Sequence, residues 1–377
     1  MNTIRASENQ RLSPLAPLIK ESWYVIDAEK EFTREIKHRT VLNEPLIYYR
    51  TEAGAPVVMD GRCPHRRFPL SEGTLKGDSV ACGYHGFTFG PDGKCSYAPG
   101  CPNGIPENIK IKIYSTAHAG PWVWVWMGEG EPDLEALPMP MDIYRRATWH
   151  YHTGCCHYNC NYGLVHENLL DLSHTYFLHK VGTFEYADAP LRFLGGGRAG
   201  WTKSLPEQIS VFGYMTGAGW HAMTHWDMHT EVVGPGLMYT YIDIKPIDQA
   251  DNLPTRGLVL QAVTPETDST SFQFWFNGND TAMVVSKEDF DALIGKVYGE
   301  DIAVLNRQQT MIANDRRQTA VEVSIPNDRS GFMFRRKIAG MAAGKKFSGS
   351  SLVAGASTPA AVSGTHRDFE QRPAVKI

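Results

Sequence analysis

The sequence lacks several features that would place it outside the ordinary globular proteins. No uninterrupted apolar run approaches the roughly 18 residues that a helix needs to cross a bilayer. Seven cysteines, an odd number in 377 residues, do not make a disulfide framework. The formal net charge is only −4, so there is no electrostatic case for a nucleic-acid or anionic-membrane partner. Residues 1–23 lack a basic stretch followed by an apolar one, and we expect a cytoplasmic protein.

Two regions of different pattern follow one another along the chain. From about Thr40 to Trp126, short segments rich in β-branched and aromatic residues are bounded by Gly, Pro and Asp, which predicts an all-β module. After a proline-rich stretch at 129–142, helical spacing at 162–180 and 287–314 encloses strand-like segments at 201–276. We therefore predict an α+β protein with domains at 1–145 and 146–340 and a tail rich in Gly, Ala and Ser at 341–377.

The all-β region carries the first predicted metal site. Cys63 and His65 are separated by sixteen intervening residues from Cys82 and His85, which gives the pattern C-x-H…C-x2-H. Two thiolates and two imidazoles on two loops suit a [2Fe–2S] cluster in which histidines replace two of four cysteines. Two ferric ions, two sulfides and two thiolates sum to about zero, against about −2 with four cysteines, so such a cluster accepts an electron more readily. A zinc site fits less well, because zinc favours C-x2-4-C spacing.

The second predicted metal site begins in the segment ENLLDLSHTYFLH. Asn168, Asp171 and His174 are each three residues apart, so on one helix they would share a face. His179 lies about 140° from His174 on an ideal helix. For both imidazoles to bind one ion, the helix must be broken or widened between Thr175 and Leu178.

A third ligand must come from elsewhere, and Asp301 is the best candidate. It continues a stripe at i, i+4, i+7 and i+11 with Phe290, Ile294 and Val297. A carboxylate on an apolar stripe would be buried, which is costly unless it is paired or bound to metal. Glu300 lies about 80° off that stripe and is the weaker candidate. Two histidines and one carboxylate form the facial triad of non-haem Fe(II) oxygenases, with open positions for O2.

Other clusters of histidine and cysteine are interpreted as structural. A sheet face or core packing is favoured over a metal site for the run HAMTHWDMHT, which contains His221, His225 and His229. Adjacent cysteines are poor tetrahedral ligands, so we do not expect zinc at residues 150–160. Alternating tryptophans are expected to form a strand face that packs between the domains: Trp122, Trp124 and Trp126.

Together, the two metal motifs resemble the oxygenase component of Rieske non-haem iron oxygenases over most of the chain. The segment from Asn168 to His179 matches that family's N-x2-D-x2-H-x4-H pattern, and GEDIAVLNRQQ is similar to its third-ligand segment, which again selects Asp301. Length and this segment look most like the branch of vanillate O-demethylase, dicamba monooxygenase and chloroacetanilide N-dealkylase. The resemblance implies an N-terminal Rieske domain and a catalytic domain of antiparallel sheet and helices with a helix-grip, START-like fold.

The resemblance also implies how the two sites cooperate. It implies a homotrimer in which the cluster of one subunit lies beside the iron of the next. Asp171 would then bridge His85 of the neighbouring subunit and the ligand His174, and Asn168 would act beside it as a catalytic residue. A separate flavin reductase, a ferredoxin or both would deliver electrons from NADH, because no G-x-G-x-x-G motif followed by an acidic residue occurs here.

The expected function is that of a terminal oxygenase for an aromatic substrate. Hydroxylation of a carbon bonded to oxygen or nitrogen yields a hemiacetal or carbinolamine that collapses, so the net reaction is oxidative O- or N-dealkylation. Two alternatives remain open from the sequence: cis-dihydroxylation of a ring, and a Rieske electron carrier without catalytic iron.

Overall fold

Three small antiparallel sheets form the N-terminal part of the protein. The computed structural model describes Ser13 and residues 15–137, 150–180, 191–196, 198–209, 223–246, 255–279, 287–316 and 322–347. The first sheet contains β1 (Trp23–Ala28), β10 (Trp122–Trp126) and β9 (Thr116–Ala119), and the second contains β2 (Lys37–Val41), β3 (Glu44–Arg50) and β4 (Pro56–Asp60). The third contains β5 (Thr74–Lys76), β6 (Ser79–Ala81), β7 (Thr88–Phe89) and β8 (Cys95–Tyr97).

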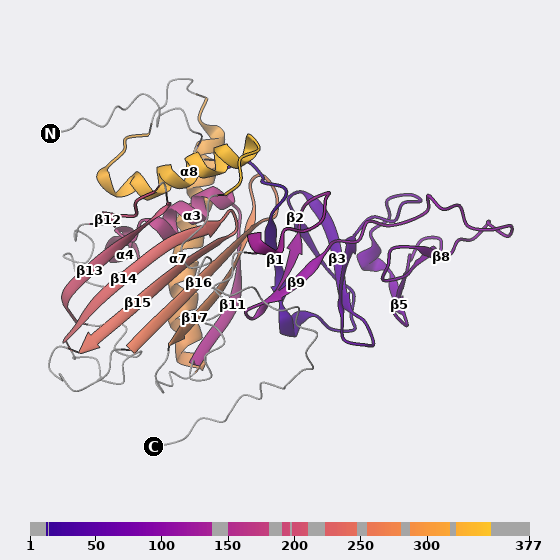
Figure 1. The fold of residues 1–377 in the computed structure, drawn as a ribbon, viewed down its shortest axis with the longest axis horizontal. Helices are drawn as coiled ribbons and strands as arrows, with labels where there is room; N and C mark the ends of the chain where they lie inside the picture. Colours follow the sequence, from indigo (N-terminus) through magenta and orange to yellow (C-terminus); the bar gives the residue numbers. More distant parts are fainter. Residues whose placement is uncertain are drawn as a thin grey trace, which may run out of the picture.

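A seven-stranded antiparallel sheet dominates the C-terminal part (Figure 1). Its order is β11 (His150–Tyr158), β17 (Ser271–Asn279), β16 (Thr255–Pro265), β15 (Leu237–Pro246), β14 (Met223–Gly234), β13 (Gly200–Ile209) and β12 (Arg192–Phe193). Among the described residues, four α-helices accompany it: α3 (Tyr162–Leu170), α4 (His174–Leu178), α7 (Lys287–Asn314) and α8 (Arg329–Ala342). The predicted α+β class and the helix at 287–314 are confirmed. The boundary predicted at residue 145 and residues 348–377 of the predicted tail lie outside the described residues.

The large sheet is buried on both faces because its strands alternate two sets of apolar side chains. In β16, Leu258 and Leu260 pack against Trp122 and Trp124 of the N-terminal module. Val263, on the opposite face of the same strand, packs in the core around α3. The predicted interdomain role of the alternating tryptophans is therefore confirmed, and the protein has three layers: the N-terminal module, the sheet and the helices.

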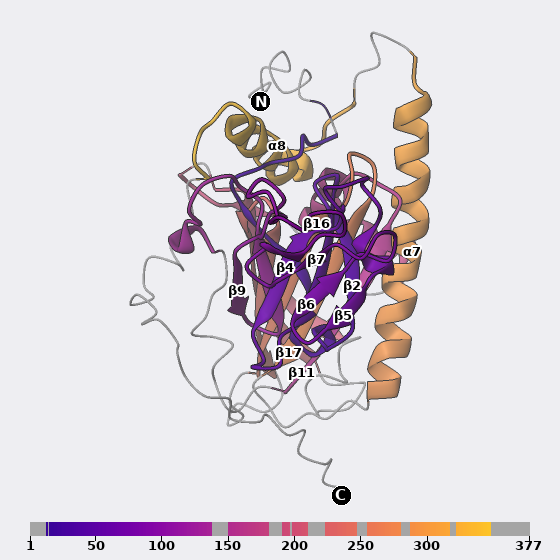
Figure 2. The same ribbon diagram turned by 90° about the vertical axis from the view of Figure 1, so that its right-hand side faces the viewer.

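The connection between the two edge strands carries two of the helices that form the site. Strand β11 lies at one edge of the sheet and β12 at the other, so the chain crosses the sheet through α3 and α4. Helix α7 follows the last strand and runs along one side of the molecule, as Figure 2 shows. Within the described part of the chain, none of the helices is both long and apolar enough to cross a membrane.

His166 ties α3 into this core. It is 0% exposed, its Nε2–H donates to the carbonyl of Pro235 at 3.0 Å, and its ring centroid lies 4.6 Å from that of Phe334 on α8. Among the described residues, Nδ1 has no hydrogen-bond partner. Burial lowers the pKa of His166 from 6.5 to about 4, so the folded protein holds a neutral imidazole here.

We expect His166 to make folding acid-sensitive. Unfolding returns its pKa to about 6.5, so the unfolded state binds more protons between pH 6.5 and 4, and stability falls as the pH falls through that window. The expected loss at pH 5 is about 2 kcal/mol. When the free energy of unfolding is measured in urea, the wild type should lose about 2 kcal/mol more than His166→Gln between pH 7.5 and pH 5. His38→Gln, a substitution at an exposed histidine, is the control. Its free energy of unfolding should change with pH as that of the wild type does. An unchanged pH dependence in His166→Gln would contradict the assignment.

Candidate metal centres

The two loops of the C-x-H…C-x2-H motif fold into matching turns. The Cys63 N–H donates to the Phe68 carbonyl at 2.9 Å, and the Arg67 N–H donates to the Cys63 carbonyl at 2.7 Å. The second loop repeats the pattern, because the Cys82 N–H donates to the Phe87 carbonyl at 2.8 Å and the Gly86 N–H donates to the Cys82 carbonyl at 3.0 Å. The fifth residue of each loop has a positive φ, +57° at Arg67 and +75° at Gly86. Each turn thus points its cysteine inward and its histidine outward.

The four predicted cluster ligands converge with buried sulfur and exposed nitrogen. Cys63 is 1% and Cys82 is 4% exposed, whereas His65 and His85 are exposed, with ring centroids 4.6 Å apart. Burial and the neighbouring Cys82 thiol raise the pKa of Cys63 to about 11. Desolvation, followed by the charges of His85 and Arg66, lowers the pKa of His65. Two buried thiols beside two exposed imidazoles offer the sulfur and nitrogen ligands that a cationic iron–sulfur core takes.

The helix of the second motif breaks earlier than its spacing indicates. Helix α3 ends at Leu170, and α4 begins at His174. The predicted break between Thr175 and Leu178 is therefore wrong, because α4 is continuous there and His179 caps its C-terminus. The expectation that Asn168, Asp171 and His174 share one helix face fails for the same reason. The break is local: the Asp171 carboxylate accepts the N–H of Ser173 at 2.9 Å, which favours a turn over a continued helix.

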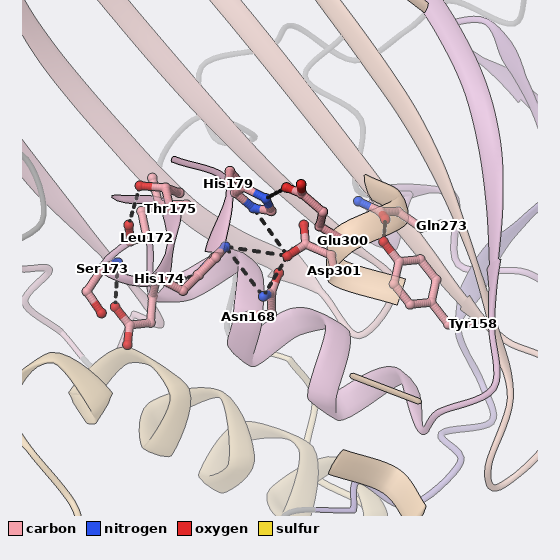
Figure 3. Close-up of polar contacts among 11 residues, drawn as sticks. Tyr158, Asn168, Leu172, Ser173, His174, Thr175, His179, Gln273, Glu300 and Asp301 are labelled. Atoms are coloured by element: carbon pink, nitrogen blue, oxygen red, sulfur yellow. Dashed lines mark hydrogen bonds and ion pairs between the residues drawn. The ribbon is translucent and has the colours of Figure 1, made fainter. Parts of the chain in front are cut away.

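His174, the first residue of α4, and His179, its C-cap, meet the predicted third ligand from α7 (Figure 3). Asp301 Oδ1 lies 3.3 Å from His179 Nε2 and 3.6 Å from His174 Nε2. One ligand atom from each residue can be chosen so that all three lie within 4.8 Å of one another. Asp301 is 4% exposed and His179 is 3% exposed, so the carboxylate is buried as the apolar stripe predicts.

Hydrogen bonds at the far side of each ring leave the Nε2 atoms free to bind a metal. His174 Nδ1 lies 2.6 Å from the backbone carbonyl of Asp171, and His179 Nδ1 lies 2.9 Å from Glu300 Oε2. An Nδ1–H that donates to oxygen places the lone pair on Nε2, which is the usual state of a metal-binding histidine. Burial opposes the charged ring, yet Asp301 and Glu300 raise the pKa of His179. A site this negative fits a divalent cation, and the three-residue set fits Fe(II).

The two further predicted site residues lie on either side of the triad. The Asn168 amide donates to Asp301 Oδ1 at 3.2 Å and lies 3.5 Å from His174 Nε2. Asp171 contacts His174 through its backbone carbonyl, while its carboxylate faces Ser173. Both residues also line a cavity of about 520 Å³ between α3, α7 and the start of α8.

Three contacts that hold this site were not predicted from the sequence. Glu300 binds His179 although it is the weaker ligand candidate. Gln309 on α7 accepts the backbone N–H of Asn161, the N-cap of α3, at 2.9 Å. Buried Arg335 on α8 forms a bidentate ion pair with Glu167 on α3. The available signal was the presence of polar residues in these helical segments, but it does not identify their partners.

The other histidine clusters take ordinary partners in the described structure. His225 and His229 lie on β14 and contact carboxylates of their own strand, Asp227 at 3.2 Å and Glu231 at 3.4 Å. His221 lies outside the described residues. The interpretation of this run as a sheet face is confirmed for the two histidines that are described.

Comparison with known families assigns both parts of the chain. Residues 22–115 match the Rieske [2Fe-2S] domain, and residues 158–344 match the vanillate O-demethylase oxygenase C-terminal domain. A cluster module joined to a sheet-and-helix domain with a two-histidine, one-carboxylate site defines a Rieske-type oxygenase component. The chain belongs to the Rieske oxygenases whose catalytic domain is of the vanillate O-demethylase type.

Individual relatives match this chain over most of their own length. The iron-sulfur subunit of a toluene-4-sulfonate monooxygenase system from Comamonas testosteroni is 29% identical, over 78% of this chain and 87% of that protein. A vanillate O-demethylase oxygenase subunit from a Pseudomonas species is 26% identical, over 85% of this chain and 93% of that protein. The crystal structure of dicamba monooxygenase bound to dicamba has a TM-score of 0.75 at 22% identity, and the match covers 88% of this chain and 100% of that one.

The two metal centres should be separable by mutation. Asp301→Ala should reduce the iron content from about three to about two per chain and leave two acid-labile sulfides, because only the mononuclear site loses a ligand. Cys63→Ser should instead remove the cluster irons and the acid-labile sulfide, while the mononuclear iron stays. Iron and sulfide analysis of anaerobically reconstituted protein checks both. Three irons in Asp301→Ala would exclude this carboxylate as a ligand.

Proposed function

We propose that this enzyme is the terminal oxygenase of a multicomponent monooxygenase that removes an O- or N-alkyl group from an aromatic substrate. The observation that carries the proposal is the convergence of His174, His179 and Asp301 beside a sheet of the vanillate O-demethylase type. Relatives named as vanillate and dicamba O-demethylases and as a chloroacetanilide N-alkylformylase support dealkylation over cis-dihydroxylation. The catalytic-domain match speaks against a mere electron carrier.

The chain's own residues would hold and shape the mononuclear centre. His174, His179 and Asp301 would bind Fe(II), which supplies O2 activation for C–H hydroxylation when bound. Asn168 donates to Asp301 and holds the carboxylate oriented toward the two rings. The burial of His179 and Asp301 keeps bulk water from that side of the site.

Electrons for this reaction would come from outside the chain. One O2, two electrons and two protons convert a methyl ether to a hemiacetal and water, and the hemiacetal then releases formaldehyde and the phenol. NADH would supply the two electrons through a separate flavin reductase, a ferredoxin or both, entering at Cys63, His65, Cys82 and His85. An enzyme that depends on this supply of NADH would work in the cytoplasm.

Transfer between subunits would connect the two centres, and a homotrimer would provide the contact. Within one chain, the module that contains β5 and β8 lies at the end opposite α4, as Figure 1 shows. The exposed loop that follows Cys63 in that module carries Arg66 and Arg67. The cavity beside Asp171 is bordered by Glu322, Asp328 and Arg335. Arg335 pairs with Glu322, and the carboxylates of Asp171 and Asp328 would complement the basic loop.

The cavity is electrostatically suited to such a partner. Burial, together with the negative charges of Asp171 and Glu322, raises the pKa of Asp328. A basic loop from the next subunit would relieve this repulsion. Asp171 would then lie between His85, on the second ligand loop of the neighbouring subunit, and His174, and would couple the two metal centres.

The dealkylation itself can be tested directly. With a surrogate reductase, NADH and a panel of methoxy- and N-alkyl-aromatics, we expect release of formaldehyde or another aldehyde in proportion to the NADH consumed. Asp301→Ala should release none. A product that is a ring cis-diol, without any aldehyde, would overturn the proposed reaction.

Asp171 offers a test of electron transfer between the centres. Asp171→Asn retains an oxygen that can accept the Ser173 N–H, whereas Asp171→Ala loses it at a cost of about 1 kcal/mol. Both variants should keep both metal centres and lose most NADH-coupled turnover, because both lose the bridging charge. Metal analysis and rapid-mixing reduction of the cluster check this. Normal turnover in Asp171→Asn would show that the bridging role is wrong.

A further inference from the structure

We propose that Glu300 is a positioning residue that makes His179 the anchoring ligand of the mononuclear site, by a charged hydrogen bond that His174 does not have. This inference rests on the proposed function, because it assumes that the triad binds Fe(II). It concerns a side chain that is not itself in the ligand group.

Two consecutive residues of α7 hold opposite nitrogens of one imidazole. Asp301 Oδ1 approaches Nε2 of His179 at 3.3 Å, while Glu300 Oε2 lies 2.9 Å from Nδ1 (Figure 3). Neighbouring helix residues point about 100° apart, so the two carboxylates reach the ring from two sides. The ring is buried at 3% exposed and is held there between them.

His174 is held differently. Its Nδ1 lies 2.6 Å from the backbone carbonyl of Asp171, which is a neutral acceptor in a turn. Its side chain is 24% exposed, against 3% for His179. A hydrogen bond to an ionised acceptor is roughly twice as strong as a neutral one. His179 is therefore the more strongly oriented of the two rings.

The carboxylate has two effects on His179 as a ligand. It holds the proton on Nδ1, so that the Nε2 lone pair faces Asp301, and it makes the ring a stronger electron donor to a cation. The Glu300 side chain is 31% exposed and engages the ring from the side away from the triad. Loss of such an outer partner typically weakens metal binding by about 10- to 100-fold.

The test measures Fe(II) affinity rather than turnover. Mononuclear iron is removed from the full-length protein while the cluster remains, and Fe(II) binding is measured by competition with a chelator. Glu300→Ala should weaken Fe(II) binding by about 10- to 100-fold, and Glu300→Gln, which keeps an acceptor without the charge, by about three- to tenfold. Co(II) substitution adds a second readout, because its visible spectrum should shift in Glu300→Ala. The visible spectrum of the cluster should stay unchanged.

Glu266→Gln is the matched control. Glu266 Oε2 lies 2.6 Å from His157 Nε2, which is the same kind of contact away from the triad. This variant should bind Fe(II) like the wild type. Wild-type Fe(II) affinity and Co(II) spectrum in the Glu300 variants would overturn the role of Glu300 and leave the proposed function intact. If Asp301→Ala also bound Fe(II) normally, the triad and the proposed function would fail instead. Should Glu300→Ala not fold, the isosteric Glu300→Gln decides alone.

Discussion

The catalytic half of this protein depends on a contact between two segments 121 residues apart in the sequence, the α4 histidines and the carboxylates of α7. Buried carboxylates are costly without a partner. Here Asp301 is compensated by two imidazoles and an amide, so the cost of burial is offset only when α3, α4 and α7 are packed together. Helix positions and site geometry therefore stabilise one another, and a divalent cation would complete the charge balance.

The large sheet has the N-terminal module on one face and the helices on the other. One face packs against the tryptophans of the N-terminal module, and the other supports the helices that carry the triad. The same alternation of side chains that buries both faces also separates the two predicted metal sites. This separation is the physical reason for proposing that electrons pass between subunits rather than within one chain.

Asp171 shows how one residue can serve several purposes at a helix break. Its carboxylate caps the turn at Ser173, its carbonyl orients His174, and its position on the cavity wall makes it available to a partner. Had α3 continued through this point, its carbonyl would have been used within the helix. The break is thus what connects the ligand ring to the cavity wall.

The sequence by itself determined most of the elements and which residues are proposed as metal ligands. The spacing of Cys63, His65, Cys82 and His85 depends on short loops, and the apolar stripe around Asp301 depends on the period of one helix; both are local properties that a sequence pattern expresses directly. The tertiary structure alone decided where the helix breaks and that Glu300 holds His179. These features arise from packing between distant segments, where the register of one helix against another selects partners that no local period encodes.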